Sequence, residues 1–370
     1  MKVLSVFGTR PEAVKMASII RLLAQTDGIE SRVCVTAQHR QMLDQVLELF
    51  AIKPDYDLDL MRDDQSIAQI SAAIFTNLDP VLADFNPDWA LVVGDTTTVV
   101  TTSLLAFYRR IRVGHVEAGL RTHDKWHPYP EEINRRMATV IADLHFAPTE
   151  WSRQNLLREG VPDSVIKVTG NPVIDALKIV AEQPVPQEIS QLLERLKISA
   201  DRRLILVTAH RRENFGQPLE NICRALKELA ARSDVEIVYP VHLNPNVQEP
   251  VYRLLKNVAH VTLLPPLDYL PLVHLMKRAA LILTDSGGIQ EEAPAFGIPV
   301  LVLREVTERP EGVEAGALKL VGTETSRIVQ EAKRLLDSKS AYAGMAKAVN
   351  PFGDGQAAQR IVEALMSSYR

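Results

Sequence analysis

The chain has 370 residues, 46% of them apolar, so it exceeds the size at which a single core usually stops growing. Its 42 basic and 46 acidic residues give a net charge of -4, which excludes an overall attraction to nucleic acid or to an anionic membrane. The two cysteines, Cys34 and Cys223, favour neither a disulfide framework nor a thiolate metal cluster. The first apolar run breaks at Gly8, too early for a signal peptide. We therefore expect a two-domain cytoplasmic protein with no nucleic-acid or membrane partner.

Short runs rich in Val, Ile and Leu alternate with amphipathic stretches of helical length, which is typical of βαβ units and parallel sheets. In the first half we expect strands near 2–7, 32–36, 89–93, 112–116, 143–147 and 165–169. In the second half we expect strands near 203–208, 235–240, 259–264, 280–284, 299–303 and 317–321. The predicted fold class is α/β with two doubly wound domains. Their ligands should bind beyond the carboxyl ends of the strands.

The first expected strand is followed by Gly8-Thr9-Arg10-Pro11-Glu12, and Lys15 lies about one turn into the next helix. Glycine lets the backbone bend closely, and a helix start presents unpaired N–H groups, here beside a guanidinium. These features suit an anion. The pattern is neither a dinucleotide fingerprint nor a P-loop, so nicotinamide and ATP have no motif support. An ordinary strand–helix turn explains it equally well.

Acidic residues follow two successive strands of the first half, with Asp95 after one and Glu117 after the next. Because the tips of parallel strands converge, we expect both at one edge of the sheet. Helix capping ahead of Thr96 is the competing explanation for Asp95. Glu131 opens a later helix that carries Arg135, where an acid also complements the helix dipole.

Metal and covalent catalysis find little support. The nine histidines show no paired ligand spacing, so we expect no metal. Asp57-Leu58-Asp59 matches the D-x-D of metal-dependent glycosyl transfer, but we place it in a polar turn after a helix. No Ser or Cys occupies a nucleophile elbow.

In the second half an apolar strand runs into Asp285-Ser286-Gly287-Gly288, which opens a helix. Such a turn can cradle a diphosphate, and Glu292 one turn later can accept hydrogen bonds from ribose hydroxyls. Arg309 and His210 lie in loops that we expect to face the same ligand. The alternative is that Ser286-Gly287-Gly288 forms this turn only for its backbone conformation and binds no ligand.

Six segments together resemble the non-hydrolysing UDP-N-acetylglucosamine 2-epimerases, and the resemblance runs from Met1 to the last helix. These segments are residues 8–12, 94–98, 115–121, 130–135, 210–213 and 285–292. The resemblance implies a glycosyltransferase-B-like fold with two Rossmann-like domains and the active site in the cleft between them. One domain would comprise residues 1–171 plus 353–370 and the other residues 172–352. It also implies a homodimer.

The resemblance further implies that UDP is bound mainly by the second domain. The residues implied are Ser286, Gly287, Gly288, Glu292, Arg309 and His210, with Arg10 and Lys15 from the first domain. The uracil would lie near Leu267 and Leu272. Leu272 stands where we expect an aromatic side chain, which leaves the packing of the base open.

The implied reaction is the reversible conversion of UDP-N-acetylglucosamine to UDP-N-acetylmannosamine at carbon 2, without a cofactor. That carbon carries no carbonyl, so its proton is weakly acidic and loss of UDP from carbon 1 must accompany deprotonation. We expect elimination to 2-acetamidoglucal followed by re-addition of UDP. Asp95, Glu117 and Glu131 are the acid/base candidates, with Arg135 orienting them and His210 assisting the departing phosphate.

Other readings stay open. Gln38 and Gln41 belong to a segment resembling the one where bacterial members bind a second, activating UDP-N-acetylglucosamine; a strand–helix turn lining the active site is the alternative. A glycosyltransferase of the same architecture would use the nucleotide site but require an acceptor. A non-catalytic nucleotide-sugar sensor would bind without turnover.

Overall fold

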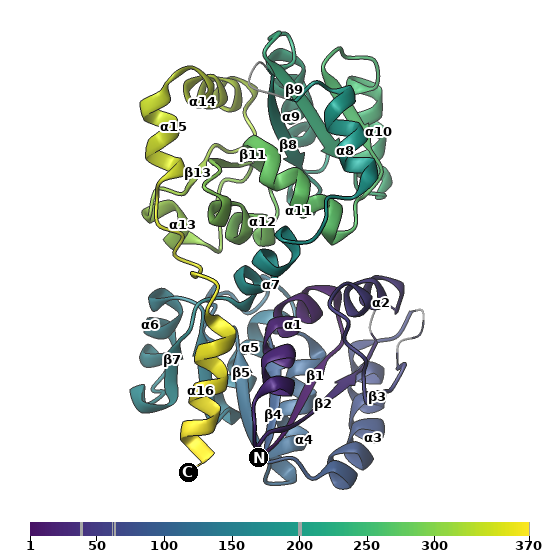
Figure 1. Ribbon diagram of the computed structural model, residues 1–370, viewed down its shortest axis with the longest axis vertical. Coiled ribbons are helices and arrows are strands. Elements are labelled where there is room, and N and C mark those ends of the chain that lie inside the picture. Colours follow the sequence, from purple (N-terminus) through teal and green to yellow (C-terminus); the bar gives the residue numbers. More distant parts are fainter. Residues whose placement is uncertain (38–39, 61, 63, 199–201, 370) are drawn as a thin grey trace. The chain divides into compact units, whose positions relative to one another are not determined.

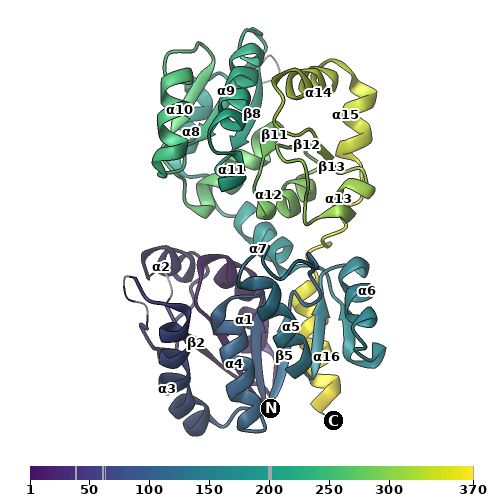
Figure 2. The same ribbon diagram turned by 180° about the vertical axis from the view of Figure 1, so that it is seen from behind.

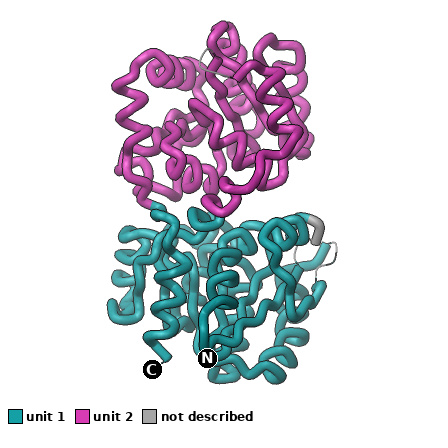
Figure 3. The backbone as a smooth tube through the Cα atoms, viewed as in Figure 1, with its two compact units in different colours: residues 1–176, 352–370 teal, residues 177–351 magenta. Residues whose placement is uncertain are grey.

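The computed structural model describes residues 1–37, 40–60, 62, 64–198 and 202–369. The chain forms two compact units (Figure 3). Unit 1 comprises Met1–Ala176 with Phe352–Arg370, and unit 2 comprises Leu177–Pro351. Each unit is a parallel sheet covered by helices.

Unit 1 contains a seven-stranded sheet in the order β3-β2-β1-β4-β5-β6-β7. Its strands are β1 (Lys2–Phe7), β2 (Glu30–Val35), β3 (Tyr56–Asp57), β4 (Trp89–Val93), β5 (Arg112–Val116), β6 (Leu144–Ala147) and β7 (Ile166–Val168). Its helices are α1 (Arg10–Gln25), α2 (Arg40–Leu49), α3 (Ile67–Phe85), α4 (Thr97–Tyr108), α5 (Glu131–Ile141), α6 (Glu150–Arg158), α7 (Pro172–Ala181), which runs into unit 2, and α16 (Ala357–Tyr369). The strand order reverses between β1 and β4, which is where doubly wound sheets bind ligands.

The apolar residues of β1, β4 and β5 are buried because helices cover both faces of the sheet. The last helix, α16, returns to unit 1 and packs against α1 (Figure 1). Asp175 fixes its start by accepting hydrogen bonds from the backbone N–H of Ala357 at 3.2 Å and of Ala358 at 2.9 Å. The end of the chain is therefore part of the first unit's core.

Unit 2 repeats this architecture with six parallel strands in the order β10-β9-β8-β11-β12-β13. Its strands are β8 (Arg203–Thr208), β9 (Val235–Pro240), β10 (Val261–Leu264), β11 (Ala279–Thr284), β12 (Val300–Val302) and β13 (Leu318–Leu320). Its helices are α8 (Gln187–Arg195), α9 (Gln217–Leu229), α10 (Pro245–Leu255), α11 (Tyr269–Arg278), α12 (Gly287–Glu292), α13 (Pro310–Glu314), α14 (Thr325–Asp337) and α15 (Lys339–Ala346). Here the order reverses between β8 and β11.

The α/β class and the alternation of strands and helices are confirmed, and each expected strand is present within a few residues of its expected bounds. One expectation is wrong. Asp57 does not lie in a turn but in β3, where it pairs with Val35 of β2 at the edge of the sheet. A two-residue edge strand buries too little to produce an apolar run, so the sequence pattern did not reveal it.

Neither cysteine is paired in the structure, and both thiols are buried. Burial raises the pKa of Cys34 and of Cys223 to about 12, which makes them inert core residues. Throughout the described residues, every helix is too short or too polar to cross a membrane. The cytoplasmic location stays a prediction.

Candidate functional site

Asp95 lies directly beyond β4, at the carboxyl edge of the unit 1 sheet. Arg135 of α5 holds its side chain, with Nε at 2.9 Å and Nη2 at 2.8 Å from Asp95 Oδ2. Asn134 donates a hydrogen bond of 2.9 Å to the backbone carbonyl of Asp95. Capping does not explain Asp95, because the N-cap residue of α4 is Thr96. The arginine fixes the position of this carboxylate through Oδ2.

Glu117 lies beyond β5, the strand next to β4. Its backbone is in the left-handed region, with φ of 62°. Glu117 Oε2 accepts from Lys15 Nζ at 2.5 Å and from Asn171 Nδ2 at 2.9 Å. A Cβ added to Gly94 would lie 3.7 Å from Glu117 Oε1, so this carboxylate sits against the turn that carries Asp95. The two acids expected at one edge of the sheet are indeed neighbours.

His115 stabilises the same turn. Its Nε2 lies 2.7 Å from the carbonyl oxygen of Gly94, and a carbonyl can only accept, so Nε2 carries the proton. Burial lowers the pKa of His115 to about 4. The imidazole is therefore neutral and structural. The sequence places His115 at the start of the segment 115–121 but indicates no role for it.

Two consecutive acids begin α5 and differ in environment. Glu131 is partly buried, and its Oε2 accepts no hydrogen bond from the described residues. Glu132 is fully buried and accepts from the backbone N–H of Thr122 at 3.0 Å and of His123 at 3.2 Å, and from Arg135 Nη1 at 3.2 Å. Arg135 thus links Asp95 to Glu132. Sequence reasoning missed Glu132, although its three-residue spacing from Arg135 places both on one helix face.

The turn between β1 and α1 brings Arg10 and Lys15 to this edge of unit 1. Arg10 is the first residue of α1 and is half-buried, and Lys15 pairs with Glu117. Gly8 is required for close packing, since an added Cβ would lie 2.2 Å from Thr36 Oγ1. Its role in the turn is therefore steric.

In unit 2, Asp285 at the end of β11 organises the loop after β8. It is buried, and its Oδ2 accepts from the backbone N–H of His210 at 2.9 Å and of Arg211 at 2.8 Å, and from Asn214 Nδ2 at 2.9 Å. His210 stacks on His242 with ring centroids 5.3 Å apart. Burial lowers the pKa of His210, and Asp285 partly opposes that shift. The loop therefore presents a neutral imidazole.

Ser286 is the N-cap residue of α12, which starts with Gly287 and Gly288. A Cβ added to Gly287 would lie 3.1 Å from Arg309 Cζ, so the guanidinium rests against this turn. Arg309 also donates to Glu291 Oε1 at 2.9 Å and to Glu308 Oε2 at 2.9 Å. The structure brings Ser286, the two glycines and Arg309 together as expected.

Glu292, at the end of α12, accepts a hydrogen bond of 2.7 Å from the hydroxyl of Tyr269. Tyr269 is the first residue of α11 and follows the loop containing Leu267. Leu267 lines a cavity of about 580 Å³ with Leu264 and residues of α8. Leu272 is partly buried within α11. Tyr269 therefore connects the segment expected beside the uracil to Glu292, the acid expected to bind the ribose.

The structure does not describe the side chains of the two glutamines expected to bind an activator. Gln38 lies outside the described residues, and Gln41 is in α2 but its side chain is not described.

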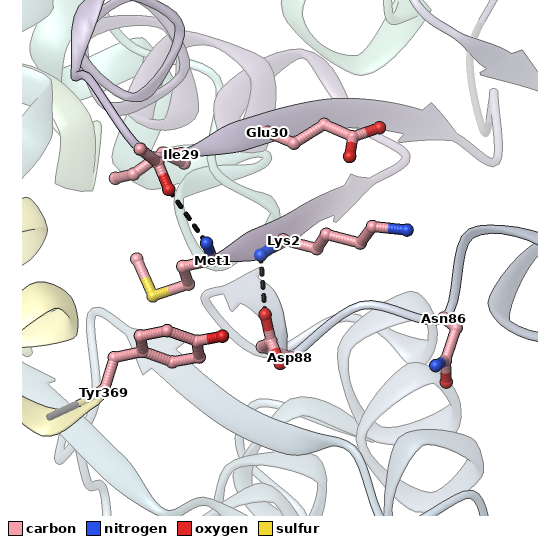
Figure 4. Close-up of a pocket in the computed structure, with 8 residues that line it drawn as sticks. Met1, Lys2, Ile29, Glu30, Asn86, Asp88 and Tyr369 are labelled. Atoms are coloured by element: carbon pink, nitrogen blue, oxygen red, sulfur yellow. Dashed lines mark hydrogen bonds between the residues drawn. The ribbon is translucent and has the colours of Figure 1, made fainter.

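Within the described ranges, no three His, Cys, Asp or Glu side chains group in a way that could hold a metal ion. A cavity of about 630 Å³ lies at the amino ends of β1 and β2, lined by Met1, Lys2, Asp88, Tyr369 and others (Figure 4). It is at the edge of the sheet opposite to Asp95 and Glu117.

The chain has two α/β units, each built on a parallel sheet, and this architecture is that of the glycosyltransferase-B-like fold class. The chain belongs to the UDP-N-acetylglucosamine 2-epimerase family, whose model matches residues 21–366. It is accordingly an isomerase of that family, and the resemblance found in the sequence is confirmed.

Relatives match over essentially the full length. The UDP-N-acetylglucosamine 2-epimerase of Salmonella typhimurium is 58% identical, covering 100% of this chain and 99% of that protein. The crystal structure of the enzyme from Neisseria meningitidis bound to UDP-GlcNAc is 51% identical, with a TM-score of 0.89 over 99% of this chain and 100% of that one. The enzyme from Methanocaldococcus jannaschii, in complex with UDP-GlcNAc and UDP, is 34% identical, with a TM-score of 0.81 over 99% and 100%.

Proposed function

We propose that this protein interconverts UDP-N-acetylglucosamine and UDP-N-acetylmannosamine by elimination and re-addition of UDP. The observation that carries the proposal is the pair of acids at neighbouring strand ends. Asp95 is held by Arg135 at 2.8 Å, and Glu117 is held by Lys15 at 2.5 Å. Inverting a carbon requires proton removal on one face and delivery on the other, so at least two positioned acid/base groups are needed.

Glu131 supplies a third group to the same reaction. Its Oε2 is buried and accepts no hydrogen bond from the described residues, so no donor in that part of the chain occupies this oxygen. Carbon 2 has no adjacent carbonyl, and its proton leaves only as the bond from carbon 1 to UDP breaks. The elimination forms 2-acetamidoglucal and UDP, and re-addition returns the proton to the opposite face of carbon 2.

Unit 2 would bind the UDP. The turn at Ser286, Gly287 and Gly288 offers backbone N–H groups, and Arg309 rests against it. Glu292 would accept hydrogen bonds from ribose, and Leu267 and Leu272 would border the uracil. Neutral His210 is suited to donate to the departing phosphate. Arg10 and Lys15 of unit 1 would supply further positive charge.

Incubation with UDP-N-acetylglucosamine alone in heavy water tests this function by NMR. Epimerisation predicts UDP-N-acetylmannosamine with deuterium at carbon 2. A glycosyltransferase would show no exchange without an acceptor, and a sensor would bind without turnover. Accumulation of free UDP and free sugar would instead identify a hydrolysing enzyme.

We also propose a homodimer formed through the outer face of α4 and α5 (Figure 2). These two helices pack together and expose large apolar side chains, namely Phe107, Tyr108, Ile133, Met137 and Val140. Several adjacent exposed apolar residues mark an interaction surface. Because the chain belongs to a family for which we expect homodimers, a second copy is the occupant that we assign to this face.

The dimer is tested by light scattering after chromatography of Val140→Glu and Val349→Glu. Val140 is 88% exposed and Val349 is 80% exposed, so neither change disturbs a core. A charge at Val140 should dissociate the dimer because it would be buried without a partner. Val349→Glu should leave the dimer intact. A wild-type protein of monomer mass, or a dimer that Val140→Glu leaves intact, would contradict the proposed interface.

A second UDP-N-acetylglucosamine acting as an activator, at the segment with Gln38 and Gln41, is proposed from the family resemblance alone. Its signature is a sigmoidal dependence of the rate on substrate concentration. Replacing both glutamines by alanine should make the curve hyperbolic. A hyperbolic curve for the wild type would remove the activator from the proposal.

A further inference from the structure

The buried carboxylate of Glu12 receives hydrogen bonds from two separate strand–helix junctions of unit 1. Its Oε2 accepts from the backbone N–H of Gly8 at 2.8 Å, from the backbone N–H of Thr9 at 2.8 Å and from Thr9 Oγ1 at 2.9 Å. Its Oε1 accepts from Thr96 Oγ1 at 2.6 Å. The first three donors belong to the β1–α1 turn, and the fourth belongs to the β4–α4 turn.

Helix capping accounts for only part of this arrangement. Glu12 is the third residue of α1, and its bond to the N–H of Thr9 is the carboxylate half of a capping box. The bond to Thr96 contributes nothing to that cap, since Thr96 is 84 positions away along the chain. It joins two turns that helix capping would leave independent.

The hydroxyl of Thr96 bonds to Glu12 and, among the residues that the structure describes, does not cap its own helix. Thr96 is the N-cap residue of α4, a position where a threonine side chain ordinarily accepts a hydrogen bond from its own helix. In the described part of the chain this side chain makes no such capping bond and instead donates to Glu12. Burial raises the pKa of Glu12, and each of its donors opposes that shift. The chain therefore keeps a buried acid at this junction and satisfies both of its oxygens.

We propose that Glu12 is a positioning residue that aligns Asp95 with the turn bearing Arg10 and the helix bearing Lys15. Thr96 is covalently adjacent to Asp95, and Arg10 and Lys15 flank Glu12 in α1. The inference rests on the proposed function for the roles of Asp95, Arg10 and Lys15. Misplacement of a reacting group by about 1 Å is sufficient to slow catalysis strongly.

Three threonine variants separate this role from simple packing. Thr96→Val removes the donor at constant shape, and Thr96→Ser restores it. Thr102→Val is the matched control, because Thr102 is buried in α4, the helix that Thr96 precedes, and its Oγ1 has no partner among the described residues. Steady-state epimerisation and thermal melting would be measured for each.

Thr96→Val should lower kcat about tenfold and leave KM within about twofold, since the bonds from Glu12 to Gly8 and Thr9 persist and keep Arg10 and Lys15 in place. Thr96→Ser and Thr102→Val should keep the wild-type kcat. Glu12→Ala should lower kcat and raise KM together, because it removes the acceptor for the donors of both turns. An unchanged kcat in Thr96→Val, or an equal loss in Thr96→Ser or Thr102→Val, would overturn the inference.

A second measurement does not depend on turnover. Amide hydrogen exchange in residues 94–98 should be faster in Thr96→Val than in Thr96→Ser or Thr102→Val. If the wild type shows no epimerisation, the proposed function fails, and the exchange data alone decide whether Glu12 anchors this turn. Equal exchange in all three variants would overturn the anchoring.

Discussion

At the residue scale, each proposed acid/base group has a different set of neighbours. Asp95 is held by an arginine, Glu117 by a lysine and an asparagine, and Glu131 has a buried oxygen that accepts no hydrogen bond from the described residues. Groups held in different environments can take different proton-transfer roles within one site. The cations fix the orientation of the first two acids before substrate arrives.

Asp95→Asn should lower kcat about 10²- to 10⁴-fold while UDP still binds, because an amide cannot exchange the proton and the UDP contacts lie mainly in unit 2. The measurements are the initial rate of epimerisation and calorimetric binding of UDP. Asp79→Asn is the matched control: Asp79 is also paired with an arginine, Arg109, but it is on the exposed surface of α3. Turnover of Asp95→Asn within about tenfold of that control would remove Asp95 from the proposed chemistry.

At the element scale, the parallel arrangement of the strands explains why the strands and the site residues at their ends could be predicted from the sequence. Apolar runs located the strands, and their carboxyl ends located Asp95, Glu117 and Ser286, because parallel strands converge at one edge. The sequence pattern gave no role to Glu12, Glu132 or His115. Their importance comes from hydrogen bonds between elements far apart in the chain, such as Thr96 to Glu12, and no local period records such contacts.

Register also pairs two buried histidines, His115 of β5 and His145 of β6. Burial lowers the pKa of each to about 4. Unfolded histidine has a pKa near 6.5, so between pH 4 and 6.5 the unfolded chain binds more protons than the folded chain. Stability therefore rises with pH across this window and is lost as the pH falls through it.

His145→Gln removes one of these groups. Between pH 7 and pH 4.5 its free energy of unfolding should fall by about 2 kcal/mol less than that of the wild type, as measured by urea denaturation. His127→Gln, at an exposed position, should lose as much as the wild type. If His145→Gln and His127→Gln lose stability equally over this pH range, the buried histidines do not govern the acid sensitivity.

At the scale of the whole molecule, the two units differ in how the chain builds them. Unit 2 is one continuous segment with its own core of buried residues from β8, β9, β11 and α9. Unit 1 is discontinuous, because α16 adds Ile361, Val362 and Leu365 to its core from the far end of the chain. The carboxyl-terminal helix is therefore needed for the first unit.

This difference predicts how fragments behave. A fragment of residues 172–351, which keeps α7 whole, should unfold cooperatively in circular dichroism and bind UDP more weakly than the full chain, because Arg10 and Lys15 are missing. A chain ending at residue 351 should lose the unit 1 transition but keep that of unit 2, since α1 loses the helix that packs against it and Asp175 loses the N–H groups of Ala357 and Ala358. A fragment 172–351 that folds but binds no UDP would place the nucleotide contacts in unit 1 and contradict the proposed division of roles.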